Sequence, residues 1–380
     1  MLSRSTLRRV ALVALHAAVI MIAAGALVTY LTARYGPIHL RAGGGCAHTW
    51  RGPDSEVLPL PFGLRLQAAA PLDSVASATL VADTGSGQAA AAVALNKAAR
   101  VGGYTFIPRY ADADRGGLWL YVAHDAYGEP LVYLAFVILL LSMLVLAPRA
   151  GRRRNTMPAP ARAAALFSGG MCLAVLFFRS LVLGNYPGAS VPDTLLTVAL
   201  TAFVVAFFSG RTIGLVSLAS GLAALCAALS SGGAGHSIPL LLDHPLLGLH
   251  VSLAMISYAL FAVLAVCGVV ALVAPRRVLS PRFVASQRRL LYYGTVALAA
   301  AIATGSLWAS QSWGRYWSWD PKETCALITL AVYLLPVHRR SLRVFRRPAS
   351  MQLFLVLAFM AVLFTWFGVN YFLGGRHAYI

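Results

Sequence analysis

A segment near the C-terminal end combines aromatic, basic and acidic residues in a pattern suited to a large, flat ligand. This Trp-rich segment, residues 308–324, contains four of the chain's seven Trp residues together with Arg315, Asp320, Lys322 and Glu323. Trp and Tyr rings can pack on a macrocycle, and indole, Arg and Lys N–H groups can reach carboxylates. A tetrapyrrole with two propionates has the matching chemistry. An aromatic belt at a membrane interface has a similar composition, so composition leaves both interpretations open.

The nine histidines supply candidate axial ligands for a haem iron, because neutral imidazole is a usual ligand of that metal. A histidine in or beside an apolar segment is costly enough to suggest a role. Four lie in such places: His16, His250, His338 and His377. For each of them a structural histidine, bonded within the fold, is the alternative. We interpret the other five as solvated: His39, His48, His124, His236 and His244.

Residues 313–324 read WGRYWSWDPKET. They resemble the WWD signature of haem-handling proteins, in the form that the CcsA (ResC) family of system II cytochrome c biogenesis carries. The related CcmC and CcmF proteins of system I match the DPKE ending less well. The resemblance implies a polytopic membrane protein that binds haem and moves it to the outer membrane face. There it would present haem for covalent attachment to the CxxCH cysteines of apocytochrome c, so haem b is a transported substrate.

The resemblance also implies roles for individual residues. His250 and His377 resemble the outer histidines that flank the signature and hold haem for transfer. His338 resembles the intramembrane histidine that follows it, and His16 the one contributed by the partner protein ResB (CcsB, Ccs1). The inner pair is taken to receive haem from the cytoplasmic side. The candidate haem-binding set is completed by Trp308, Trp313, Tyr316, Trp317, Trp319, Asp320, Lys322 and Arg179. For Arg179, as for Arg376, a propionate is the expected partner and a lipid headgroup the alternative.

The N-terminal part resembles a short ResB-like half, at about residues 1–148, fused to a CcsA-like half at about 160–380. The likeness rests on residues 95–97, 102–106 and 128–133. A full ResB half has more membrane spans and a larger outer domain. A separate ResB-like protein and thiol reductants are therefore candidate partners beside apocytochrome c.

The elements that position these residues are apolar helices. The chain is 59% hydrophobic and only 11% charged, whereas a soluble domain carries about 25% charged residues. A span needs about 20 apolar residues. The sequence predicts nine spans, over residues 10–31, 131–147, 163–182, 194–209, 212–230, 250–273, 289–308, 323–338 and 350–373. The fold class is an all-α polytopic membrane protein.

The net charge of +19 reflects orientation rather than nucleic-acid binding. Most Lys and Arg residues fall on alternate loops, and the positive-inside rule makes that side cytoplasmic. The N-terminus is then cytoplasmic, and the C-terminus and the Trp-rich segment are extracytoplasmic, in a bacterial-type inner membrane. This topology places His250 and His377 at the level of the Trp-rich segment. Two histidines and an aromatic surface are together the parts needed to bind a bis-His haem.

Residues 34–128 form the one long polar segment, and we expect a small β-rich extracytoplasmic domain there. Strands are predicted at 78–82, 103–107 and 118–122, with Gly and Asp clusters between them. An exposed linker without activity is the alternative. The five Cys residues form no CxxC or CxxCH, so neither a zinc site nor haem attachment to this chain is indicated.

Three hypotheses for the function follow. The first is a cytochrome c synthase (haem lyase), or a subunit of one, that exports haem and ligates it. The second is a haem chaperone or exporter of the CcmC kind, which forms no bonds. The third is a structural membrane scaffold with an ordinary aromatic belt, and the Trp cluster beside Asp320 and Lys322 argues against it.

Overall fold

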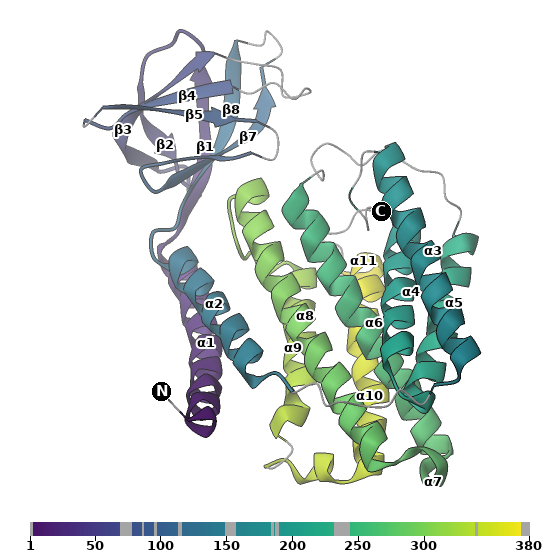
Figure 1. Cartoon of the computed structure of the whole chain (residues 1–380). Coiled ribbons are helices and arrows are strands. Elements are labelled where there is room, and N and C mark those ends of the chain that lie inside the picture. The colour runs from purple at the N-terminus through teal and green to yellow at the C-terminus, as the bar shows by residue number, and fades with distance from the viewer. Residues whose placement is uncertain are drawn as a thin grey trace. The chain divides into compact units, whose positions relative to one another are not determined.

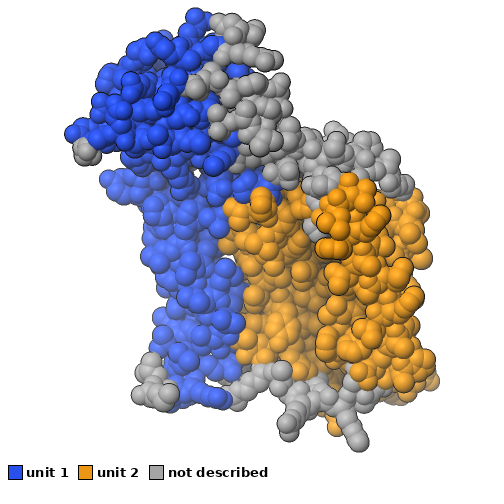
Figure 2. All heavy atoms as spheres, turned by 45° about the horizontal axis from the view of Figure 1, so that its top comes forward, with its two compact units in different colours: residues 1–146, 239–244, 305–318 blue, residues 147–238, 245–304, 319–380 orange. Residues whose placement is uncertain are grey.

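The computed structural model describes residues 3–68, 78–85, 87–94, 97–112, 116–148, 157–183, 186, 190–231, 244–338 and 341–373. The chain divides into two compact units, coloured separately in Figure 2. Unit 1 comprises residues 1–146, 239–244 and 305–318, and unit 2 comprises residues 147–238, 245–304 and 319–380. One division follows residue 146, and the assignment of a ResB-like and a CcsA-like half stays a prediction. However, residues 308–318 of the Trp-rich segment group with the N-terminal part of the chain and not with the helices around them in sequence.

In unit 1, the described residues of the polar segment form eight strands in two antiparallel sheets of four (Figure 1). The sheet orders are β1-β8-β7-β6 and β2-β3-β4-β5. The strands are β1 Arg34–Arg41, β2 Ala47–Arg51, β3 Val57–Ala68, β4 Ala78–Asp83, β5 Gln88–Val93, β6 Ala99–Val101, β7 Tyr104–Ala111 and β8 Gly117–His124. The three predicted strands are confirmed as β4, β7 and β8. The other five were missed.

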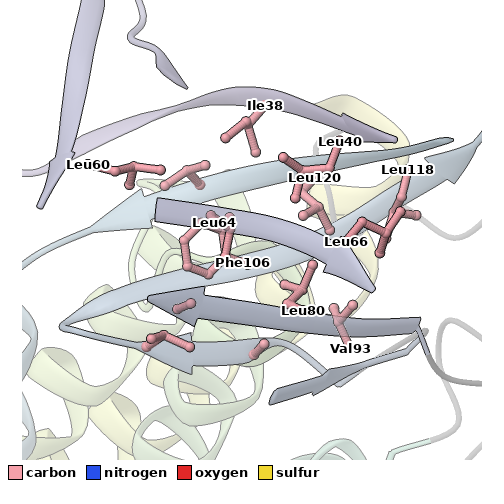
Figure 3. Packing of buried hydrophobic residues seen from close by; sticks show 14 of the residues in the cluster. Ile38, Leu40, Leu60, Leu64, Leu66, Leu80, Val93, Phe106, Leu118 and Leu120 are labelled. Atoms are coloured by element: carbon pink, nitrogen blue, oxygen red, sulfur yellow. The ribbon is translucent and has the colours of Figure 1, made fainter. Parts of the chain in front are cut away.

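The two sheets share one apolar core, shown in Figure 3. Alternate residues of β8 face inward, so that Leu118, Leu120 and Val122 are all at most 1% exposed, as the period of two in a strand requires. The strands that were missed have weak local signals. β5 is mostly Ala and β3 is interrupted by Pro and Gly, which are poor strand formers. Pairing and burial, not propensity, make them strands.

Helices α1 (Arg4–Thr32) and α2 (Gly128–Leu146) precede and follow the β domain and pack against each other within unit 1. Their backbones approach closely at two glycines. A Cβ on Gly25 would lie 2.5 Å from Cγ2 of Val132, and one on Gly128 would collide with Thr29. Small residues at helix contacts are typical of apolar surroundings, where dispersion contacts replace the hydrophobic effect.

Unit 2 consists of helices, joined at α8 to unit 1. They are α3 Ala159–Leu183, α4 Val191–Phe208, α5 Arg211–Ser230, α6 Pro245–Val273, α7 Pro275–Val278, α8 Pro281–Trp313, α9 Pro321–Leu334, α10 Pro348–Leu363 and α11 Val369–Phe372. α10 continues into α11 through a π-helical turn at Phe364–Gly368. α8 is continuous across the division, because its residues 305–313 belong to unit 1.

Among the described residues, eight helices are long and apolar enough to cross a membrane. They correspond to eight of the nine predicted spans. The adjacent predicted spans 194–209 and 212–230 are confirmed as separate helices α4 and α5, broken at Ser209 and Gly210. The predicted span at 323–338 is the shorter helix α9, of 14 residues, followed by a 3₁₀ turn at Leu335–His338. Whether α9 is a further crossing stays a prediction, as does the extracytoplasmic position of the β domain.

Candidate functional site

The first two Trp residues of the Trp-rich segment lie in the last turns of α8. The rings of Trp308 and Trp313 meet edge to face, with centroids 4.8 Å apart, and they are only 1% and 8% exposed. Gly314 ends the helix in the left-handed region at φ 76°, and its N–H donates to the Ser310 carbonyl. A glycine suits this position because it carries no Cβ. The two buried rings therefore stabilise the segment and do not form an open platform.

Arg315 contacts the outer face of the β domain. Its guanidinium carbon lies 3.9 Å from the ring centroid of Tyr35 in β1, and Nη2 donates to the Tyr121 hydroxyl in β8 at 3.0 Å. Burial raises the pKa of Tyr35, with a further rise from Asp125 and an opposing effect from Arg315. Tyr35 therefore stays neutral, and the contact with Arg315 is a cation–π interaction and not an ion pair.

Tyr316 begins a chain of hydrogen bonds that ends on a carboxylate. The Thr29 hydroxyl donates to Asp125 Oδ2 at 2.5 Å. The Tyr316 hydroxyl lies 2.7 Å from Thr29 Oγ1 and must be the donor in that pair, because the Thr29 proton is already used. Burial raises the pKa of Tyr316 to about 12, so the hydroxyl keeps its proton at physiological pH. Asp125 Oδ1 also accepts from the Gly128 N–H at 2.8 Å, at the start of α2.

A third contact, also within unit 1, joins the end of α8 to β6 and α2. Arg100 Nη2 donates to Ser310 Oγ at 3.3 Å and to Glu129 Oε1 at 2.9 Å. The Tyr133 hydroxyl donates to the same Glu129 oxygen at 2.8 Å, and the Tyr133 ring meets the Tyr316 ring with centroids 6.1 Å apart. Residues 310–316 are thus bound to β1, β6, β8, α1 and α2 within unit 1.

The other two Trp residues differ in exposure. Trp317 is half-buried. Trp319 is 56% exposed and has φ 57°, a left-handed conformation that is uncommon for a bulky side chain and stores strain. Among the four Trp residues of the segment, Trp319 presents the most surface to a ligand.

The acidic residues at the end of the segment cap helix α9. Asp320 is the N-cap, Pro321 follows it, and Glu323 at the third helical position completes a capping box. Glu323 Oε2 accepts from the Asp320 N–H at 3.2 Å. Such a box satisfies helix N–H groups that would otherwise lack acceptors. Lys322 donates to Asn370 Oδ1 of α11 at 3.0 Å, which ties α9 to the end of the last helix within unit 2.

His250 is the candidate iron ligand that the structure describes in most detail. It lies in the second turn of α6 and is half-buried. Its Nδ1 lies 2.7 Å from the carbonyl oxygen of Ala301 in α8. A carbonyl only accepts, so Nδ1 carries the proton and the neutral ring has its lone pair on Nε2. A ligand histidine is commonly oriented and set to one tautomer by such a bond from its other nitrogen.

Of the remaining predicted ligands, the structure describes His16 and His338. His16 is exposed on α1 of unit 1, with Nδ1 donating to the Leu12 carbonyl at 2.7 Å. His338 is exposed at the end of the 3₁₀ turn in unit 2. His377 and Arg376 lie outside the described residues. The haem-ligand pairs predicted from sequence therefore stay predictions.

Arg179, the candidate propionate partner, is bound to an acidic side chain. Its Nε donates to Asp193 Oδ1 at 2.6 Å, and Nη2 lies 3.4 Å from Ser190 Oγ. Asp193 is 4% exposed, and a buried carboxylate requires such a partner. A propionate would have to share the guanidinium with Asp193.

Sequence reasoning missed the residues that hold the segment in place. The D-x-x-E spacing of Asp320 and Glu323 is a known helix-start signal and could have been recognised. Thr29, Asp125 and Asn370 carry no local signal that points to the segment, because Thr29 and Tyr316 are 287 positions apart in the chain.

Apolar helices of spanning length make the chain a polytopic membrane protein with a β domain between its first two helices. The sequence profile described as "Cytochrome C assembly protein" matches residues 127–377. That range is more than half of the 380 residues, and the chain belongs to this family.

Individual relatives match over shorter regions. Protein NrfI of Wolinella succinogenes is 42% identical over 89 residues, which are 23% of this chain and 10% of the relative. Cytochrome c biogenesis protein CcsA of Gloeobacter violaceus is 40% identical over 93 residues, 24% of this chain and 27% of the relative. The CcsA protein of Lactuca sativa is 38% identical over 91 residues, 24% and 28% of the two chains. The chain thus matches less than a third of the length of these relatives.

Proposed function

We propose that this protein binds haem and presents it at the extracytoplasmic membrane face for covalent attachment to the CxxCH cysteines of apocytochrome c. Membership of the cytochrome c assembly family supports a role in the maturation of cytochrome c. The WGRYWSWDPKET stretch at residues 313–324 supports haem as the ligand. The observation that carries the proposal is the hydrogen bond from His250 Nδ1 to the Ala301 carbonyl, because a bond of this kind commonly orients a ligand histidine and sets its tautomer.

His250 would hold the iron from one side and His377 from the other, giving a six-coordinate, low-spin haem. His16 and His338 would form an inner site through which haem arrives from the cytoplasmic side. Trp319, the most exposed of the four Trp rings, and Lys322 would set the orientation of the macrocycle. Holding the haem vinyl groups beside the cysteine thiols converts a bimolecular reaction into an effectively unimolecular one.

The ligation step is the addition of two thiols to two vinyl groups. Each cysteine S–H adds across one vinyl double bond: sulfur bonds to the carbon next to the ring, and the thiol proton ends on the terminal carbon. No electrons are gained or lost, so the step requires only that the apocytochrome thiols arrive reduced. A separate thiol reductant is the partner that would keep them so, and a ResB-like protein is a candidate second partner.

The test is the visible spectrum of the purified protein, reduced and oxidised, before and after alkaline pyridine. We expect a bis-His type b spectrum that weakens in His250→Ala and in His377→Ala, with loss of cytochrome c maturation in cells. His48→Ala is the matched control, because His48 is an exposed histidine of the β domain. Normal maturation in both ligand variants would overturn the site.

Two further outcomes separate the alternatives. Covalent haem on apocytochrome, in cells that lack every other maturation system, supports ligation by this chain. Bound haem without covalent product under those conditions indicates the chaperone activity instead. A colourless protein, even when co-expressed with a ResB-like partner in haem-replete cells, would overturn haem handling altogether.

A further inference from the structure

The Trp-rich segment is bound at both ends by different parts of the chain. Residues 310–316 contact strands β1, β6 and β8 and helices α1 and α2 of unit 1. From Asp320 onward, the segment is capped onto α9 in unit 2. Between the two anchors lie only Trp317, Ser318 and Trp319. A stretch this short has few conformations to lose on ordering.

We infer that the N-terminal unit positions the Trp-rich segment for haem presentation, with Arg315 and Tyr316 as the positioning residues. This inference rests on the proposed function and deepens it. It assigns a task to the N-terminal half of the chain.

One carboxylate joins the elements of the anchor. Asp125 accepts from Thr29 of α1 and from the first backbone N–H of α2, and Tyr316 is bonded to Thr29. Tyr316 is only 3% exposed, so a break in this chain would leave a buried hydroxyl without its partner. Hydrogen bonds in series that end on an ionised group strengthen one another. A displacement of α1 relative to α2 would therefore be transmitted to Tyr316.

Arg315 adds a second, independent contact with the same unit. The planar guanidinium covers the Tyr35 ring while one of its N–H groups reaches the Tyr121 hydroxyl. Lysine can supply the charge over the ring but not this fork geometry. When the contacts of Arg315 and Tyr316 are both formed, the backbone position at which residues 317–319 begin is fixed relative to the N-terminal unit.

The test uses the full chain with Tyr316→Phe, Thr29→Val and the double variant. Tyr110→Phe is the control, because Tyr110 lies on the same β domain, is 57% exposed and packs on Trp119. The readouts are protein level in membranes, haem per protein, cytochrome c maturation, and carbon monoxide binding by the reduced haem. Carbon monoxide binding reports access to the iron. A simple loss of folded protein lowers the amount of haem but does not change the fraction of that haem that binds carbon monoxide.

We expect each single variant to lower maturation about fivefold, the factor that matches one net hydrogen bond. Haem per protein should stay within about twofold of the control, and carbon monoxide should bind a larger fraction of the haem. The double variant should resemble the singles, since contacts in one network are not additive. Arg315→Lys should retain more maturation than Arg315→Gln at equal protein level, which gives a second test if Tyr316→Phe does not accumulate.

Maturation equal to the control in Tyr316→Phe and Thr29→Val would overturn the inference, as would losses that multiply in the double variant. Loss of haem together with maturation would assign the network to haem retention and also overturn presentation. These results differ from a failure of the proposed function, in which His250→Ala itself would keep normal maturation.

Discussion

At the scale of single residues, the Trp-rich segment contains buried side chains that stabilise the fold and one exposed ring, that of Trp319, for which we propose contact with haem. Trp308 and Trp313 are buried, and Asp320 caps a helix. Trp319 is exposed and strained. Outside the segment, Nδ1 of His250 is bonded to a carbonyl. A motif that looks uniform in sequence therefore contains side chains in at least two different environments.

The capping role of Asp320 leads to a residue-level prediction. Asp320→Ala should destabilise the protein by about 1 kcal/mol, the usual cost of losing an N-cap side chain. Asp320→Asn and Asp320→Ser should restore most of that loss, because both side chains can accept the same N–H. Thermal unfolding in detergent, followed by intrinsic fluorescence, measures the effect. If the Asn variant is as unstable as the Ala variant, the negative charge and not the cap is what matters.

At the scale of elements, polar pairs connect the apolar helices of unit 2. Gln287 of α8 and Gln352 of α10 exchange two amide hydrogen bonds, at 2.8 and 3.0 Å, in a fully buried setting. The hydroxyls of Thr329 and Thr365 meet at 2.9 Å where the last helix widens into its π turn. Such bonds fix the helix register where apolar side chains alone would allow sliding.

The close contact of α1 with α2 gives an element-level prediction. Gly128→Ala would drive a methyl group into Thr29, and overpacking of this kind costs about 1–3 kcal/mol. Because Thr29 also holds Tyr316, maturation should fall along with stability. Gly170→Ala is the matched control: its Cβ would meet nothing within 4 Å in helix α3. Equal melting temperatures for the two variants would contradict the packing that we describe.

At the scale of the whole molecule, the crossing number decides on which side of the membrane His377 lies. Nine crossings place the Trp-rich segment and the C-terminus on the same, extracytoplasmic side. The eight helices of spanning length alone would separate them. A shared site for His250 and His377 therefore requires α9, with its 3₁₀ extension, to cross.

Reporter fusions test this topology. Alkaline phosphatase should be active when fused after Ser318 and after Ile380, and a fluorescent protein should be bright after Leu342. If α9 does not cross, the Leu342 fusion will instead show phosphatase activity and the Ile380 fusion will fluoresce. That result would remove His377 from the outer site.

Much of this protein could be predicted from its sequence alone. Runs of about 20 apolar residues predict helices without reference to their neighbours, because an unpaired backbone group is intolerable in lipid. The strands β4, β7 and β8 have alternating side chains and were predicted for the same local reason. The candidate site was found because its residues are consecutive, from Trp308 to Lys322, or occur in recognisable surroundings.

Only the tertiary structure decided how those residues are held. Ala-rich β5 is a strand because β4 pairs with it, not because of its composition. Tyr316 reaches Thr29 across 287 positions of chain, and Lys322 reaches Asn370 across 48. No local pattern specifies such pairs, because a hydrogen bond between distant residues depends on how whole elements pack. The sequence determined which residues could do the chemistry, and packing decided that the N-terminal unit holds the first part of the segment while helix α9 holds the rest.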